Sequence, residues 1–435
     1  MSSSCEISFK KKADLFSFEY LKCIRYIINV DSTTSILSKK LYSKLITASH
    51  LLEDFLDFHG AKHNFEWVFY RELTAAVRHL SLAGYSQKHI VNRIEFYQLK
   101  DIEDFIFESR DTLMMIQDSL KLAAPVILKE AESLGIEIPA FGYDSRFFPG
   151  IATGERLEHN IDDFDDRDRQ KKKLTVIASE FLELIENFEQ FSFYERYDSR
   201  KIKELVPEKV NEVEIRRFEM LLHNLQSSFD SYVVHGGIHH SGKMTLKELR
   251  SHFSIAFHIL QVVGRLLHFY ERHLHDVEYK SRYKSVSEAL TGIIDPDVLL
   301  DRAVNYGLFY VRQFFSNGKE IAFQILNENI DRSSIKVGIP EERGFHSRPS
   351  LLVAKIVQHY GGEVELIVGG DSFDAASVLD IQWAGGKIKK EDIVEVIFQG
   401  DSRALADIEV LAGVNYAEDS MGKGVPLPKE LSYLK

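Results

Sequence analysis

The chain is poor in cysteine, proline and tryptophan, with two, nine and two of them among 435 residues. Two cysteines, Cys5 and Cys23, are too few for a disulfide framework or a four-thiolate zinc site, so both are predicted to be free thiols. There is no run of about 18 uncharged apolar residues, and the polar, lysine-bearing start has no apolar stretch of signal-peptide length. We therefore expect a cytoplasmic protein with no membrane insertion.

Positive charge is also scarce. Lys and Arg total 54 against 66 Asp and Glu, which gives a formal net charge of −12. Duplex binding requires clustered cations against the phosphate backbone, so no nucleic acid is expected as a partner. The apolar share of 44% indicates a folded protein, and the length exceeds the ~100 to 200 residues typical of one domain, so more than one core is expected.

Most of the chain has apolar residues at helical spacing. The predicted helices span residues 13–28, 36–58, 64–82, 87–99, 102–134, 174–191, 207–229, 246–275 and 298–327. Gly84 is predicted to end the third of them. The glycine- and charge-rich stretch between the two groups of helices predicts a surface loop or linker. The organisation is therefore a helical subdomain at 1–140, a linker at 141–173 and a helical subdomain at 174–330, with the two subdomains either separate or packed as one domain.

The pattern changes near residue 335, because the last 100 residues hold 12 of the 25 glycines. Ile335, Val337 and Ile339 alternate with other residues as in a half-buried strand, and 363–368 alternates likewise before a Gly-Gly turn. Further strands are predicted at 372–373 and 393–398, and helices at 350–359, 378–384 and 402–411. The fold class is thus multidomain: a large all-α N-terminal region plus a C-terminal α+β domain at 335–420, with helices on one face of a mainly antiparallel sheet and a tail at 421–435.

One motif contains candidate reactive residues: Gly344-Phe345-His346-Ser347-Arg348-Pro349. Proline is favoured at the first position of a helix, so Pro349 predicts that a helix starts just after His346. Ser347 and Ser350 then belong to a helix start, where free amides and the helix dipole favour an anion. The imidazole of His346 is a nucleophile and the Arg348 guanidinium fits phosphoryl oxygens. The combination predicts a phosphorylatable histidine.

Residues from about 335 to 414 resemble the histidine-containing phosphocarrier HPr of the bacterial phosphotransferase system. Gly344, His346, Arg348 and Pro349 reproduce the G-x-H-x-R-P signature of that family. The resemblance implies an open-faced sandwich in which His346 accepts a phosphoryl group from an upstream phosphoenolpyruvate-dependent enzyme. It also implies that Arg348 steadies the transferring group, that an unknown downstream protein receives it, and that no cofactor is needed. The helical region resembles no family.

The resemblance extends to Ser377, which falls where HPr proteins of some bacteria are phosphorylated by an HPr kinase. Ser377 and Asp380 also form a Ser-x-x-Asp pattern, which is typical of an ordinary helix N-cap. Both interpretations stay open.

The leading hypothesis is a phosphocarrier or phosphorylation-dependent regulatory protein that signals through or to its helical region. The alternatives are a docking module whose histidine is never phosphorylated, and a metal-dependent enzyme in the helical region. For the last, His268, Glu271 and His275 share a predicted helical face, and Glu72 and His79 share another but without the spacing of metal ligands. No second Glu-x-x-His segment completes a two-metal pattern, so these histidines, like the cluster His235, His239 and His240, are interpreted as structural and no metal is predicted.

Overall fold

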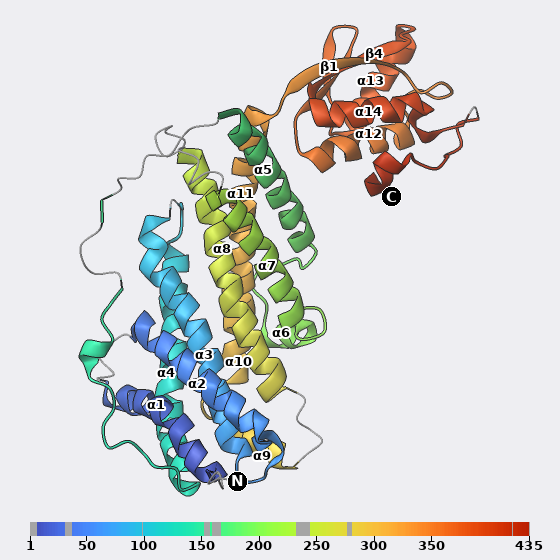
Figure 1. Cartoon of the computed structure of the whole chain (residues 1–435). Helices are drawn as coiled ribbons and strands as arrows, with labels where there is room; N and C mark the ends of the chain where they lie inside the picture. The colour runs from blue at the N-terminus through green and yellow to red at the C-terminus, as the bar shows by residue number, and fades with distance from the viewer. Residues whose placement is uncertain are drawn as a thin grey trace, which may run out of the picture. The chain divides into compact units, whose positions relative to one another are not determined.

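The computed structural model is mostly helical, with a small antiparallel sheet near the C-terminal end (Figure 1). The residues that it describes are 7–30, 37–97, 99–151, 157–158, 167–231, 244–275, 281–419 and 421–434. The predicted combination of a large helical region with a C-terminal α+β region is confirmed.

The chain divides into two compact units, each built from three stretches of sequence. The first comprises Met1–Ile161, Asn187–Asn224 and Arg250–Asn317. The second comprises Asp162–Glu186, Leu225–Leu249 and Gly318–Lys435. Segments far apart in the sequence therefore build each core together.

The first four helices pack against one another within the first unit. They are α1 (Phe9–Asn29), α2 (Lys39–Phe58), α3 (Val68–Arg93) and α4 (Glu103–Ser133). The α3 helix packs against both α2 and α4, and α1 contacts the same two helices. Ser8 and Ser38 cap the first two helices by accepting from the amides of Lys11 and Leu41. The apolar stripes predicted from the sequence supply this shared core.

Gly84 does not end a helix, so that prediction is wrong. The two predicted helices at 64–82 and 87–99 are one continuous helix, α3, and Gly84 lies inside it. A β-carbon at Gly84 would overlap the ring of the fully buried Tyr42 on α2. Glycine is required here because two helices approach each other closely. In the sequence alone, such a glycine cannot be told from one that ends a helix.

Seven more helices follow before the sheet. They are α5 (Arg167–Glu189), α6 (Ser199–Leu205), α7 (Glu212–Phe229), α8 (Met244–Phe269), α9 (Ser281–Thr291), α10 (Pro296–Asp301) and α11 (Phe309–Asn329). The helix α5 starts within the predicted linker, because a run of Lys and Arg continues a helix readily. Two π-helical segments, Tyr270–Leu274 after α8 and Arg302–Leu308 before α11, extend their neighbouring helices. The predicted helical runs at 246–275 and 298–327 are confirmed, whereas α6 and α9 were not predicted.

The segment Thr245–Leu274 is long and apolar enough to cross a membrane by length and composition. In the structure, 78% of its most apolar window is buried against other parts of the protein.

The C-terminal region holds four antiparallel strands and three helices. The strands are β1 (Arg332–Gly338), β2 (Val364–Val368), β3 (Asp371–Asp374) and β4 (Glu395–Asp401), in the order β1-β4-β2-β3. The helices are α12 (Ser347–Tyr360), α13 (Val378–Lys390) and α14 (Ser402–Gly413). Alternate residues of β2 and β4 are buried, including Leu366 and Phe398, in one core with apolar residues of all three helices. This arrangement places the start of α12 at the end of the loop that follows β1.

The last residues of the chain belong to the same core. Leu431 and Leu434 are buried among the residues of the C-terminal region. The backbone of Glu418 pairs with that of Gly424 in an isolated antiparallel bridge. This C-terminal segment therefore folds onto the region that carries the sequence motif.

Candidate functional site

The loop before α12 has the geometry that its sequence predicts. The helix starts at Ser347, directly after His346, and Pro349 is its third residue. Gly344 has a φ of +59°, which favours glycine, although there is open space for a side chain. His346 is the N-cap residue, and its side chain makes no capping hydrogen bond. The ring is thus left free for another role at the helix start.

The motif residues differ in their exposure. The side chain of His346 is 26% exposed, and Ser347 and Arg348 are exposed. Ser350 is fully buried, and its hydroxyl donates to the carbonyl oxygen of Phe345 at 3.1 Å. Ser347 therefore lies at the solvent-exposed start of the helix, whereas the buried side chain of Ser350 stabilises the loop through its hydrogen bond.

A carboxylate that the sequence analysis missed lies against the histidine. The Nε2 atom of His346 lies 2.9 Å from Oε1 and 3.2 Å from Oε2 of Glu418. The side chain of Glu418 is almost completely buried, with 1% exposed. A carboxylate accepts, so Nε2 carries the proton and donates, and this leaves the lone pair of Nδ1 for chemistry.

The turn that positions Glu418 next to His346 has a strained backbone. Asn415, Tyr416 and Ala417 have positive φ values of 48°, 54° and 58°, a left-handed conformation that only Asn among them adopts readily. The Asn415 side chain accepts from the amide of Glu341 and donates to the carbonyl of Glu418. Such backbone strain costs of order 1–3 kcal/mol per residue and is concentrated at functional sites.

The C-terminal segment also contacts the arginine of the motif. The guanidinium of Arg348 lies so close to Gly424 that a β-carbon there would overlap it. Glu418 and Gly424 are held together by their backbone bridge. One short segment thus positions a carboxylate at the imidazole and a backbone surface at the guanidinium.

Ser377 is the N-cap of α13. Its hydroxyl oxygen accepts from the amide of Asp380 at 3.3 Å, as the Ser-x-x-Asp pattern predicts. The structural interpretation of Ser377 is confirmed. Its phosphorylation stays a prediction.

In the helical region, the predicted histidine face does not form a cluster. Glu271 accepts from the amide of Glu212, and His275 stacks on Tyr270. The chain winds as a π-helix over Tyr270–Leu274, so the spacing of three and then four residues from His268 through Glu271 to His275 no longer defines one helical face. His235, His239 and His240 lie outside the described residues.

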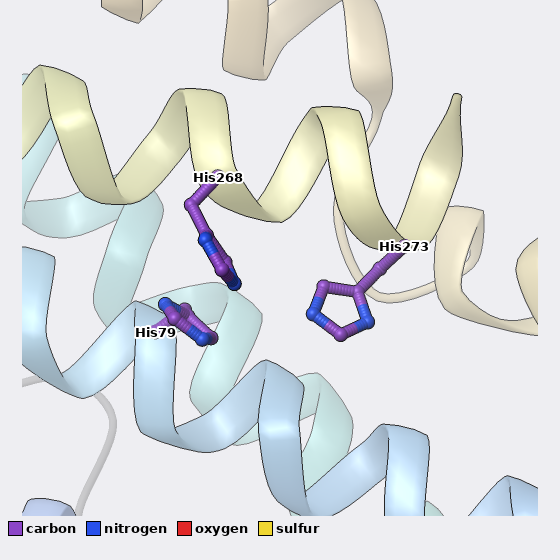
Figure 2. A group of neighbouring side chains, drawn as sticks. All are labelled: His79, His268 and His273. Atoms are coloured by element: carbon purple, nitrogen blue, oxygen red, sulfur yellow. The ribbon is translucent and has the colours of Figure 1, made fainter. Parts of the chain in front are cut away.

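A different set of histidines comes together within the first unit. His79 on α3 and His268 on α8 stack their rings, with centroids 3.8 Å apart, and the ring of His273 in the π-helical segment lies beside this pair at 5.9 Å from each (Figure 2). One ligand nitrogen from each ring lies within 4.8 Å of the other two. One partial signal of this cluster is present in the sequence, because Glu72 and His79 share a helical face and Glu72 contacts His273 in the structure.

Comparisons with protein-family models, with curated proteins and with solved structures find no match for this chain. The resemblance to HPr therefore rests on the motif residues and on their setting.

Proposed function

We propose that this protein is a phosphocarrier or phosphorylation-dependent regulatory protein that accepts a phosphoryl group on His346. The observation that carries the proposal is the geometry of His346: a partly exposed imidazole at a helix start, with Nε2 held by the buried carboxylate of Glu418. The HPr-like motif residues support the same chemistry.

The nucleophile in this proposal is Nδ1. Its lone pair attacks the phosphorus of a phosphorylated donor enzyme, so a nitrogen–phosphorus bond forms while the bond from phosphorus to the donor breaks. The ring becomes positively charged as this bond forms, and the Glu418 carboxylate at Nε2 stabilises that charge. The reverse attack by an acceptor protein restores the neutral ring.

The phosphoryl oxygens would be met by two groups. The backbone amides of Ser347 and Arg348 begin α12, have no acceptor within the helix and lie at the positive end of its dipole. The Arg348 guanidinium is exposed beside them. Both stabilise an anion on the side of the ring away from Glu418.

A partner protein must reach the imidazole. Leu351 on α12 and Leu379 and Trp383 on α13 are exposed apolar side chains, and these two helices contact each other. Exposed apolar residues near a reactive group are typical of a docking surface. We propose that an upstream phosphoenolpyruvate-dependent enzyme and a downstream acceptor dock here, and that the attached helical region transmits the phosphorylation state.

The test uses the full chain with phosphoenolpyruvate and the general upstream enzyme of the phosphotransferase system. The expected result is one acid-labile phosphate per chain that is lost in His346→Ala. The matched control is His359→Ala, which removes an exposed histidine from the same helix and should keep the label. Absence of any label that depends on His346 overturns the proposal and leaves the docking function for this surface.

A further inference from the structure

The three-histidine cluster has second contacts that orient two of its rings. The Nδ1 atom of His268 lies 2.8 Å from Oε2 of Glu212, and the Nδ1 atom of His273 lies 2.5 Å from Oε2 of Glu72. Because carboxylates accept, both Nδ1 atoms carry protons and both Nε2 atoms present lone pairs. Carboxylates in this position orient metal-ligating histidines and increase their basicity.

Two atoms of the cluster are buried without a partner. Nε2 of His273 and Nδ1 of His79 make no hydrogen bond among the described residues, although His79 and His273 are only 4% and 7% exposed. A buried polar nitrogen without a partner costs about 1–3 kcal/mol, so its retention points to a ligand.

The π-helical winding of one segment brings two histidines of the cluster to the same side of their helix. His268 and His273 are five residues apart, a spacing that falls on opposite sides of an α-helix but on one side of a π-helix. The π-helical segment Tyr270–Leu274 therefore brings His273 to the same side as His268, facing His79 on α3 (Figure 2). Single π turns occur frequently at functional sites.

The cluster borders a cavity of about 430 Å³ within the first unit. Its basic lining residues are Lys62, Arg71, Arg78, Arg216, Arg265 and Arg272. Glu53, Asp57 and Glu72 neutralise Arg71, and Glu212 pairs with Arg216. By contrast, no carboxylate of the described residues lies within ion-pair distance of the half-buried Arg265, so its charge is available to an anion in the cavity.

We propose that His79, His268 and His273 form a divalent metal centre, best suited to Zn²⁺, whose open coordination position faces the basic cavity and takes an oxyanion such as phosphate. Three protein ligands with one open position is the arrangement of zinc sites that bind an exogenous ligand. Zinc–nitrogen bonds of 2.0–2.1 Å place tetrahedral ligand nitrogens about 3.4 Å apart, so binding draws the ligand nitrogens together by roughly 1 Å. Binding also turns the stacked rings of His79 and His268 apart, because each nitrogen binds a metal along a lone pair in the plane of its ring. Arg265 then binds the oxyanion from the side opposite the metal.

The first test titrates metal-depleted full-length protein with Co²⁺, whose visible bands report four-coordinate geometry. The wild type is expected to take up one equivalent into a site with intense bands that Zn²⁺ abolishes. His79→Gln and His273→Gln should lose the bands, and Glu72→Gln should weaken Co²⁺ binding 10- to 100-fold. The control is His258→Gln, a half-buried histidine on α8 outside the cluster, which should bind as the wild type does. Circular dichroism of each variant confirms that it is folded.

The second test adds inorganic phosphate to the Co²⁺-loaded protein. Phosphate should shift the visible bands of the wild type, whereas Arg265→Gln should keep the metal and show at least a tenfold weaker phosphate response. Folded wild type without stoichiometric uptake, or uptake that is unchanged in both histidine variants, overturns the metal centre. Uptake without any response to phosphate overturns the oxyanion ligand. These outcomes do not depend on whether His346 is phosphorylated.

Discussion

The imidazole of His346 and the carboxylate of Glu418 are 72 residues apart in the chain and in direct contact in the fold, with Nε2 2.9 Å from Oε1. The contact fixes which ring nitrogen holds the proton. It also couples the reactive residue to the segment that ends the chain.

Glu418→Gln should slow phosphorylation of His346 by about 10- to 100-fold, because a hydrogen bond to a charged group is worth about 1.5–3 kcal/mol. The measurement is the initial rate of acid-labile labelling. Glu430→Gln removes an exposed carboxylate from the same C-terminal segment and should label at the wild-type rate. Equal rates for the two variants would show that Glu418 has no part in the transfer.

Gly424→Ala should displace the Arg348 guanidinium, since the new methyl group takes its place. The side chain is long and exposed, so we expect the free energy of unfolding to change by less than about 0.5 kcal/mol while the labelling rate falls at least fivefold. Gly413→Ala is the control, because its β-carbon meets open space. An unchanged labelling rate in Gly424→Ala would mean that the position of Arg348 is immaterial.

Ser377→Ala should destabilise the start of α13 by about 1 kcal/mol through loss of the cap, and Ser377→Asp should preserve it. The measurement is hydrogen exchange at the first amides of α13, where the loss corresponds to about fivefold faster exchange. Identical exchange in the two variants would contradict the capping role.

Gly84→Ala should destabilise the protein by about 1–3 kcal/mol, because overpacking against the buried Tyr42 ring exceeds the ~1 kcal/mol that alanine contributes to a helix. Gly264→Ala, in the interior of α8, has its nearest neighbour 3.8 Å from the new methyl group and should be stabilising. Melting temperatures of the two variants are expected to shift in opposite directions. A stabilised Gly84→Ala would show that α2 and α3 are further apart than described.

Acid should destabilise the protein through a half-buried pair of histidines, His89 on α3 and His258 on α8. Burial lowers the pKa of His258 to about 4 and that of His89 to about 3. Lys39 donates to Nδ1 of His89, which requires a neutral ring. Between pH 6.5 and 4 the unfolded chain binds protons that the folded chain does not, so stability falls with falling pH, by up to about 3 kcal/mol for His258.

This pH dependence is measured as the melting temperature of wild type and His258→Gln from pH 7.5 to 4.5. The two curves should diverge below pH 6.5, with the variant losing less stability, because Arg93 and Arg250 also oppose a proton on His258. Parallel curves would mean that His258 takes up its proton over the same pH range in the folded and the unfolded protein, which contradicts the lowered pKa.

The sequence predicted what depends on local patterns. Apolar periodicity located most helices, and alternation with glycine turns located the strands around the His346 loop. Gly84 was misread because a helix end and a close helix contact both require glycine. Glu418 was missed because three preceding residues in the left-handed backbone conformation place it beside His346, and no local sequence pattern indicates that conformation.

The histidine cluster could not be predicted from the sequence, for a different reason. Its partners come from α3 and from a segment about 200 residues later, so only the packing of the two brings Glu72 and His273 together. The sequence did place Glu72 and His79 on one face, but the spacing of His268 and His273 fits a site only after the helix changes its winding. Ordinary helical spacing pointed to Glu271 and His275, which have other contacts.

The π-helical turn at Tyr270–Leu274 adds one residue to the helix that it extends. Deleting one residue within the turn would let ordinary helical winding resume with the two histidines of this helix four residues apart, a spacing that keeps both on one side of an α-helix. All three imidazoles would therefore still converge. Alignments that treat a one-residue gap here as a loss of equivalence would separate proteins that share this cluster.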